Sequence, residues 1–275
     1  MQKVLYTRDI QSVSEFVDSA VISYINEGQI ETFESFSTFD IIAFDWYDVR
    51  HLDRAPGQIM IYLDADDLFF LCENEYAYNK AAALFKPADS NERALYSFFR
   101  ALLRDDGQLL EQLEEQVTAM EDGLLDGSRR TATGDIMALR RRLLRLKRYY
   151  EQLDGIFEEL TENDNDLIQE DALRHFIILG SRMDRLLRSV GSLRDYVTQL
   201  REAYQAQVDI EQNKLMKVFT VVTAVFLPLT LIVGWYGMNL KMPEYGWEFG
   251  YPLVIVLSVA VCAVCVWFFK KRSWL

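Results

Sequence analysis

Residues 213–239 read NKLMKVFTVVTAVFLPLTLIVGWYGMN, and this stretch decides the fold of the chain. From Val218 to Trp235 it has 18 residues without a charged side chain, just enough to cross a bilayer core as a helix. A second uncharged run extends from Pro252 to Phe269. One such run also fits a buried core helix, but two in tandem favour a pair of membrane-spanning helices.

Positive charges flank these two runs at their outer ends and are scarce between them. The flanking residues are Lys214, Lys217, Lys270, Lys271 and Arg272. Cytoplasmic flanks of membrane helices are enriched in Lys and Arg. We therefore expect a multi-pass protein of the cell membrane with both termini in the cytoplasm and with residues 240–251 outside.

The two spans differ in polarity. The first contains three threonines, one proline and Gly234, whereas the second contains a single serine among apolar residues. Small and hydroxyl-bearing residues suit close helix packing or a wet wall, and a proline is tolerated where neighbours satisfy the freed carbonyl. This asymmetry suggests that the first span lines a pore and that the second surrounds it.

Residues 91–217 are dominated by helix-forming residues and contain no proline. Turn signals divide them into helices at about 91–125 and 135–160, and a third helix that begins near residue 167 and runs on into the first span. The third helix carries an apolar stripe at steps of three and four from Leu173 to Tyr204. Self-association around an axis would bury this stripe, and so would packing against the other two helices. Both arrangements stay open, each over a different part of the length of this helix.

The first 90 residues have another pattern, with aromatic and β-branched runs that are typical of strands. We expect strands at 3–7, 39–48, 58–66 and 67–74 and a helix at 13–27. The fold class is thus an α+β membrane protein with a small N-terminal α/β domain. The predicted segments are 1–90 (α/β domain), 91–217 (long helices), 218–239 (first span), 240–251 (outer loop), 252–269 (second span) and 270–275 (basic tail).

Composition excludes several functions. The formal net charge is -13 and no basic patch is interleaved with aromatic residues, so nucleic acid is not an expected partner. Three cysteines and two histidines are too few and too scattered for a zinc site or a disulfide framework. Nucleophiles and bases are not grouped and no phosphate-binding glycine loop occurs. We therefore expect neither an enzyme nor a small organic substrate.

The first span ends in the tetrad Tyr236-Gly237-Met238-Asn239. Around it stand NKLMKVFT at 213–220, LPLT at 227–230, MPE at 242–244, GYP at 250–252 and a final KKRSWL. Together with the two C-terminal spans, these motifs closely resemble the CorA family of magnesium transporters. The resemblance is strong from about Tyr204 to Leu275, generic over the preceding helices and poor before residue 90.

The resemblance implies a funnel-shaped homopentamer in membrane lipid, with five first spans around a pore for Mg²⁺. It implies a selectivity filter formed by Tyr236, Gly237, Met238 and Asn239. The implied pore-lining residues are Asn213, Met216, Phe219, Thr223, Leu227, Thr230 and Gly234. Of these, Met216, Phe219 and Leu227 would form the hydrophobic gate. Co²⁺ and Ni²⁺ are further expected permeants.

Mg²⁺ keeps its octahedral water shell, so neutral oxygens that grip these waters suit it better than carboxylates would. Glu244 and Glu248 in the outer loop either concentrate cations or are ordinary solvated acids. The resemblance also implies a regulatory Mg²⁺ between subunits, with Glu202 as its ligand and Asp209 as a second candidate. Loss of this ion would leave the carboxylates to repel one another and would open the gate.

Two rival readings stay open. The nearest is a zinc transporter of the same fold, although the unaltered Gly-Met-Asn favours magnesium. The other is a membrane-anchored coiled-coil scaffold that transports nothing. A scaffold role would not explain why the first span is uncharged and pore-like and ends in this tetrad.

Overall fold

The computed structural model covers all 275 residues and describes them except for 18–20, 23–31, 49–54, 126–131, 239–245 and 273–275. The chain forms two compact units, Met1–Arg201 and Glu202–Leu275. The first unit joins the predicted α/β domain and most of the long helices in one body. The second contains the two predicted spans.

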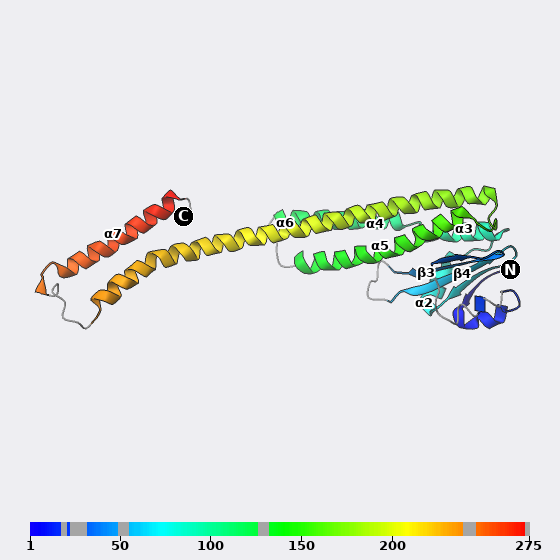
Figure 1. The fold of residues 1–275 in the computed structure, drawn as a ribbon, viewed down its shortest axis with the longest axis horizontal. Coiled ribbons are helices and arrows are strands. Elements are labelled where there is room, and N and C mark those ends of the chain that lie inside the picture. The colour runs from blue at the N-terminus through cyan, green and yellow to red at the C-terminus, as the bar shows by residue number, and fades with distance from the viewer. Residues whose placement is uncertain (18–20, 23–31, 49–54, 126–131, 239–245, 273–275) are drawn as a thin grey trace. The chain divides into compact units, whose positions relative to one another are not determined.

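The first unit is built on a five-stranded sheet in the order β1-β5-β4-β3-β2 (Figure 1). Strand β1 pairs with β5 in parallel, and the other neighbours are antiparallel. The strands are β1 (Gln2–Tyr6), β2 (Phe33–Ser35), β3 (Phe39–Trp46), β4 (Gly57–Asp64) and β5 (Leu68–Cys72). The four predicted strands are confirmed, whereas the short β2 was not predicted.

Both faces of this sheet are buried, which explains why β3, β4 and β5 read as apolar runs rather than as alternating patterns. One face packs against α2 (Glu75–Leu84), α3 (Asn91–Leu102) and α5 (Ala132–Glu162). The other face is covered by η1 (Thr7–Val13) and by Val17 and Val21. The predicted helix at 13–27 lies mostly outside the described residues. Helix α2 was not predicted.

The predicted helix at 91–125 is wrong in one respect, because it is broken into α3 and α4 (Asp106–Leu125). At the break, one Arg182 nitrogen donates to the backbone carbonyls of Leu103 (2.8 Å) and Arg104 (3.2 Å). Carbonyls at a helix end need such partners when the helix does not continue. Arg182 therefore stabilises a turn that local sequence does not announce.

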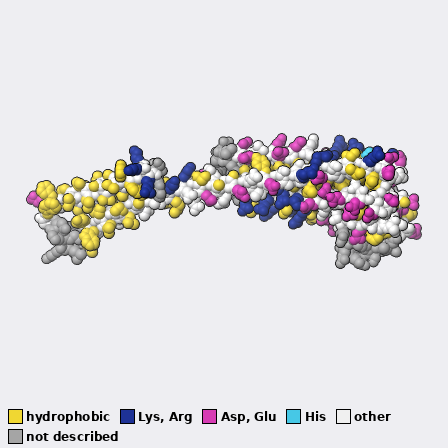
Figure 2. Space-filling model, turned by 45° about the horizontal axis from the view of Figure 1, so that its top comes forward, with side chains coloured by type: hydrophobic (Ala, Val, Ile, Leu, Met, Phe, Trp, Pro, Cys, Tyr) yellow, Lys and Arg dark blue, Asp and Glu magenta, His cyan; other side chains and the backbone are white. Residues whose placement is uncertain are grey.

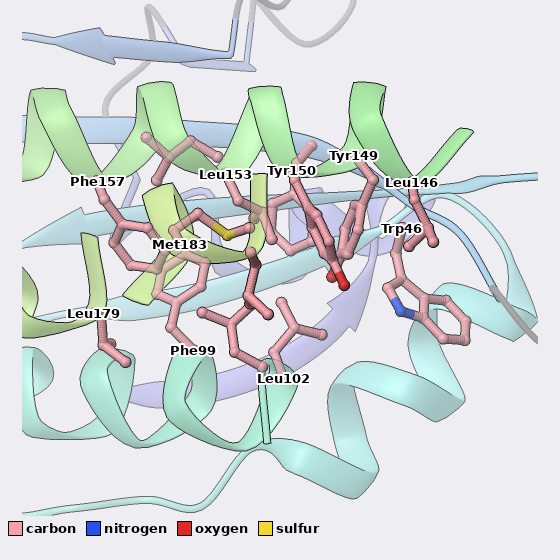
Figure 3. Packing of buried hydrophobic residues seen from close by; sticks show 14 of the residues in the cluster. Trp46, Phe99, Leu102, Leu146, Tyr149, Tyr150, Leu153, Phe157, Leu179 and Met183 are labelled. Carbon is pink, nitrogen blue, oxygen red and sulfur yellow. The ribbon is translucent and has the colours of Figure 1, made fainter. Parts of the chain in front are cut away.

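The long helices share one core with the sheet (Figure 3). Phe157 of α5 packs edge-on against Phe99 of α3, with 5.1 Å between ring centroids, and both side chains are fully buried. Helix α6 (Glu170–Tyr236) adds the buried Phe176, Met183 and Leu200 to this core. The apolar stripe of α6 thus packs within its own chain as far as Leu200.

One titratable group lies in this core beside the helix break. Burial raises the pKa of Asp106 to about 6. This effect outweighs the lowering of the pKa by the Tyr150 hydroxyl, Lys80 and Arg182. The Tyr150 hydroxyl faces Asp106, but neither Asp106 Oδ2 nor Tyr150 Oη forms a well-aligned hydrogen bond. An incompletely satisfied polar group in a core lowers stability.

The second unit contains the rest of α6 and α7 (Gly250–Lys271). Helix α6 continues without interruption to Tyr236, as predicted, with Pro228 inside it. These two helices are long and apolar enough to cross a membrane. Figure 2 shows the change in surface: hydrophobic side chains dominate α7 and the end of α6, and charged ones dominate the first unit.

Candidate functional site

The membrane part of α6, from Asn213 to Tyr236, has one side covered by α7. Its covered residues are the buried Val221 and the half-buried Ala224, Val225, Pro228, Leu229, Ile232 and Tyr236. The half-buried residues of α7 are Gly250, Val254, Ser258, Val261, Cys262, Cys265 and Phe269. Both sets recur at helical spacing, so each helix shields one side of the other.

The other side of α6 is bare, and it holds the residues that were predicted to line a pore. All seven are exposed: Asn213, Met216, Phe219, Thr223, Leu227, Thr230 and Gly234. A helix turns by about 100° per residue, which centres this set roughly 180° from the covered set. We call these seven residues the predicted pore face. The structure gathers them on one side and turns them away from α7.

Large apolar side chains are exposed on this face. Met216 is 57% exposed, Phe219 65% and Leu227 66%. These are the three residues implied to form the gate. A closely approaching helix from another copy, or lipid, must cover such side chains, because contiguous apolar surface is otherwise a liability.

The threonine hydroxyls of this segment already use their protons in hydrogen bonds to the backbone. The hydroxyls of Thr220, Thr223 and Thr230 donate to the carbonyls four residues earlier, at 2.8, 2.8 and 2.9 Å. A hydroxyl whose proton is used in this way still offers its oxygen lone pairs as acceptors. On the predicted pore face, Thr223 and Thr230 therefore present acceptors, which suit water molecules that donate their hydrogens away from a cation.

The helix ends tightly at the proposed filter. The Gly237 amide donates to the Val233 carbonyl at 2.8 Å, and the Met238 amide to the Trp235 carbonyl at 3.3 Å. A Cβ at Gly237 would lie 2.8 Å from the Val233 carbonyl oxygen, closer than real Cβ atoms approach. Close backbone packing thus requires glycine here. Asn239 lies outside the described residues.

Hollows on the two sides of α6 bring predicted residues together. One hollow runs along the predicted pore face and is lined by Leu227, Thr230, Leu231, Gly234, Trp235 and Met238. Tyr236 and Gly237 line another with Glu248, at the end where α7 begins. Glu248 is therefore near the filter, whereas Glu244 lies outside the described residues.

The regulatory candidates stand apart from each other. Glu202 and Asp209 are both exposed on α6, about two turns apart, and Gln205 donates to Asp209 at 3.2 Å. Across the described part of the chain, no group of three or more His, Cys, Asp or Glu side chains is arranged to hold a metal. Glu202 and Asp209 therefore form no such group with other described residues of one chain.

Comparison with known families finds a match over residues 13–271 to the family described as CorA-like Mg²⁺ transporter protein. The chain belongs to this family. The CorA family consists of membrane transporters rather than enzymes, which confirms the family and the class predicted from the sequence. It is also consistent with the two apolar helices of the second unit.

Two curated CorA relatives illustrate the match. The chain is 27% identical over 283 residues to the cobalt/magnesium transport protein CorA of Thermotoga maritima, covering 97% of this chain and 80% of the relative. It is 28% identical over 267 residues to the magnesium transport protein CorA of Pasteurella multocida, covering 82% of this chain and 83% of the relative.

Solved structures share the fold. The CorA magnesium transporter of Methanocaldococcus jannaschii superposes with a TM-score of 0.78 at 19% identity, over 98% of this chain and 87% of that one. The full-length CmaX protein gives 0.76 at 18% identity, over 98% and 85%. The ZntB cytoplasmic domain of Vibrio parahaemolyticus gives 0.60 at 13% identity, over 76% and 87%. At these identities the likeness shows the fold alone.

Sequence reasoning missed one contact in the membrane part. The Cys265 sulfur of α7 lies 3.9 Å from the carbonyl oxygen of Ala224 in α6. The signal was present, because Pro228 leaves the carbonyl four residues earlier without its helical donor.

Proposed function

We propose that this chain is a subunit of a channel-type transporter that admits hydrated Mg²⁺ into the cytoplasm, with Co²⁺ and Ni²⁺ as further permeants. One observation carries the proposal. The seven residues expected to line a pore occupy a single bare side of α6, opposite the side that α7 covers. Five copies of α6 around a shared axis would bury this side and enclose a path.

The chemistry of the predicted pore face suits a hydrated cation. It carries no charge, and Thr223 and Thr230 direct free lone pairs outward from hydroxyls whose protons are engaged. Weak contacts through the water shell permit both binding and release, which conduction requires. Asn239 amide and Gly237 carbonyl oxygens would bind the same shell at the outer end.

The gate is proposed at the bare apolar residues. Rings of Met216, Phe219 and Leu227 would close the path by expelling water from it. Glu202 and Asp209 from neighbouring copies would hold a regulatory Mg²⁺ that keeps the ring closed. Because Glu202 and Asp209 lie about two turns apart on one helix, the site depends on the proposed assembly. Lys214, Lys217, Lys270 and Lys271 support cytoplasmic termini.

Divalent flux into proteoliposomes tests the proposal. The wild type should admit Mg²⁺, and Asn239→Ala should lose most of this flux because the filter loses its amide oxygens. Val256→Ala is the matched control, since Val256 lies on α7 and is 66% exposed away from α6. Equal flux in wild type and Asn239→Ala would refute the filter, and selective Zn²⁺ flux would favour the zinc transporter.

A second assay tests regulation. Wild-type flux should fall as Mg²⁺ is raised on the cytoplasmic side, and Glu202→Ala should weaken this inhibition. Asp195→Ala is the control, because Asp195 is also exposed on α6 but lies in the first unit. If the same Mg²⁺ concentration inhibited Glu202→Ala and the wild type equally, Glu202 would not be part of the regulatory site.

A further inference from the structure

Pro228 leaves a carbonyl in α6 without its helical donor. A proline has no amide hydrogen, so the carbonyl four residues earlier, that of Ala224, loses its usual bond. In a bilayer, water cannot replace the missing donor, and an unpaired carbonyl is costly. Ala224 and Pro228 are both half-buried on the side of α6 that α7 covers. A donor is therefore needed from α7.

Helix α7 places a thiol at this point. Cys265 Sγ lies 3.9 Å from the Ala224 oxygen, within reach for a donor sulfur, across 41 positions of sequence. A cysteine thiol is a weak donor, but it has no water competing with it inside a membrane. The hydroxyl of Ser258, also on the covered side of α7, already donates to the Val254 carbonyl at 2.8 Å. Cys265 thus supplies the donor that Pro228 makes necessary.

We propose that Cys265 is a positioning residue for ion passage, whose thiol holds α6 against α7 at Pro228. Pro228 lies between Leu227 and Thr230 of the predicted pore face, and a helix bends most easily at a proline. This contact therefore sets how the outer part of that face is directed relative to the inner part. The thiol would hold the segment that leads to Gly237 and Met238. The effect on flux rests on the proposed function, whereas the contact itself does not.

A packing role makes a different prediction from a donor role. If Cys265 only fills space, its removal has the same effect whether or not residue 228 is a proline. If it donates to Ala224, its removal matters only while that carbonyl lacks an amide partner. Pro228→Ala restores the amide, which makes it the partner variant for a double-mutant cycle.

The experiment measures Mg²⁺ flux and thermal stability of the full-length protein in lipid. Cys265→Ala should lower flux about threefold, because the loss of a typical interhelical hydrogen bond in a membrane changes an equilibrium by about that factor. Cys262→Ala, also half-buried on α7, is the matched control and should behave as wild type. In the Pro228→Ala background, Cys265→Ala should cause no further loss.

Equal losses from Cys265→Ala in both backgrounds would overturn the donor role. The infrared S–H stretching band gives a measurement that needs no proline variant. A difference spectrum between wild type and Cys265→Ala should show a band at the lower frequency of a hydrogen-bonded thiol. A band at the free-thiol frequency would contradict the contact. Absence of any wild-type flux would refute the proposed function and leave this spectral test intact.

Discussion

Replacing Gly237 by alanine tests the close packing at the end of α6. The added Cβ would lie 2.8 Å from the Val233 carbonyl oxygen, whereas ordinary contact begins at 3.4 Å, so these atoms must separate by 0.6 Å. The clash is with backbone, and the Val233 carbonyl also accepts the Gly237 amide at 2.8 Å. Neither group can turn aside without loss of the last helical hydrogen bond.

Backbone strain of this kind costs about 1–3 kcal/mol. An energy of this size changes the population of the native conformation about 5- to 150-fold. Gly237→Ala should therefore lower Mg²⁺ flux in proteoliposomes by at least about fivefold, with the mass of the assembly unchanged. The strain falls on the turn that presents the filter and leaves the helix before it intact.

Gly246→Ala is the control for this experiment. Gly246 also lies beyond the end of α6, and a Cβ there would meet nothing within 4 Å. Its flux should match that of the wild type. If Gly237→Ala conducted as well as Gly246→Ala, close packing at Gly237 would have no role in ion passage.

Three further predictions concern stability and gating. The pKa of Asp106, raised by burial from 3.8 to about 6, means that the folded state binds the proton more tightly, so stability falls as pH rises between these values. Asp106→Asn should then raise the melting temperature at pH 7.5 but not at pH 4, and an equal rise at both would contradict this. Phe157→Ala, in the core at 1% exposure, should cost about 3–5 kcal/mol in denaturant unfolding, against under about 0.5 kcal/mol for Met137→Ala at 58% exposure. Leu227→Asn should wet the gate and raise flux at high cytoplasmic Mg²⁺, and unchanged inhibition would exclude Leu227 from the gate.

Much of the fold was predictable because the decisive signals are long. Uncharged runs, a helix without a breaker as far as Pro228, and strands buried on both faces all appear as uninterrupted patterns. The break between α3 and α4 was not predictable, because Arg182 stabilises it from 78 positions away. The three-residue β2 depends on pairing with β3, which a sequence pattern this short does not specify.

The candidate site was also predictable only in part. The polarity of the first span predicted a pore wall, but the individual positions came from the family resemblance. Which side of α6 meets α7 depends on packing between the helices, and only the structure shows that the predicted pore face is the bare side. Pro228 indicated a carbonyl without its helical donor, but that Cys265 is the group in contact with it depends on the register of α7 against α6.

Cysteine accessibility in the assembled membrane protein tests the central claim most directly. Single cysteines would replace Thr223, Leu227 or Thr230 on the predicted pore face, and Val218 or Val222, which are exposed at 58% and 49%, as controls away from it. A charged, membrane-impermeant thiol reagent should block Mg²⁺ flux through the first three variants and spare the two controls and the wild type. Equal reactivity on all sides of α6, or no block at Thr223, Leu227 and Thr230, would contradict a shared aqueous path along this face.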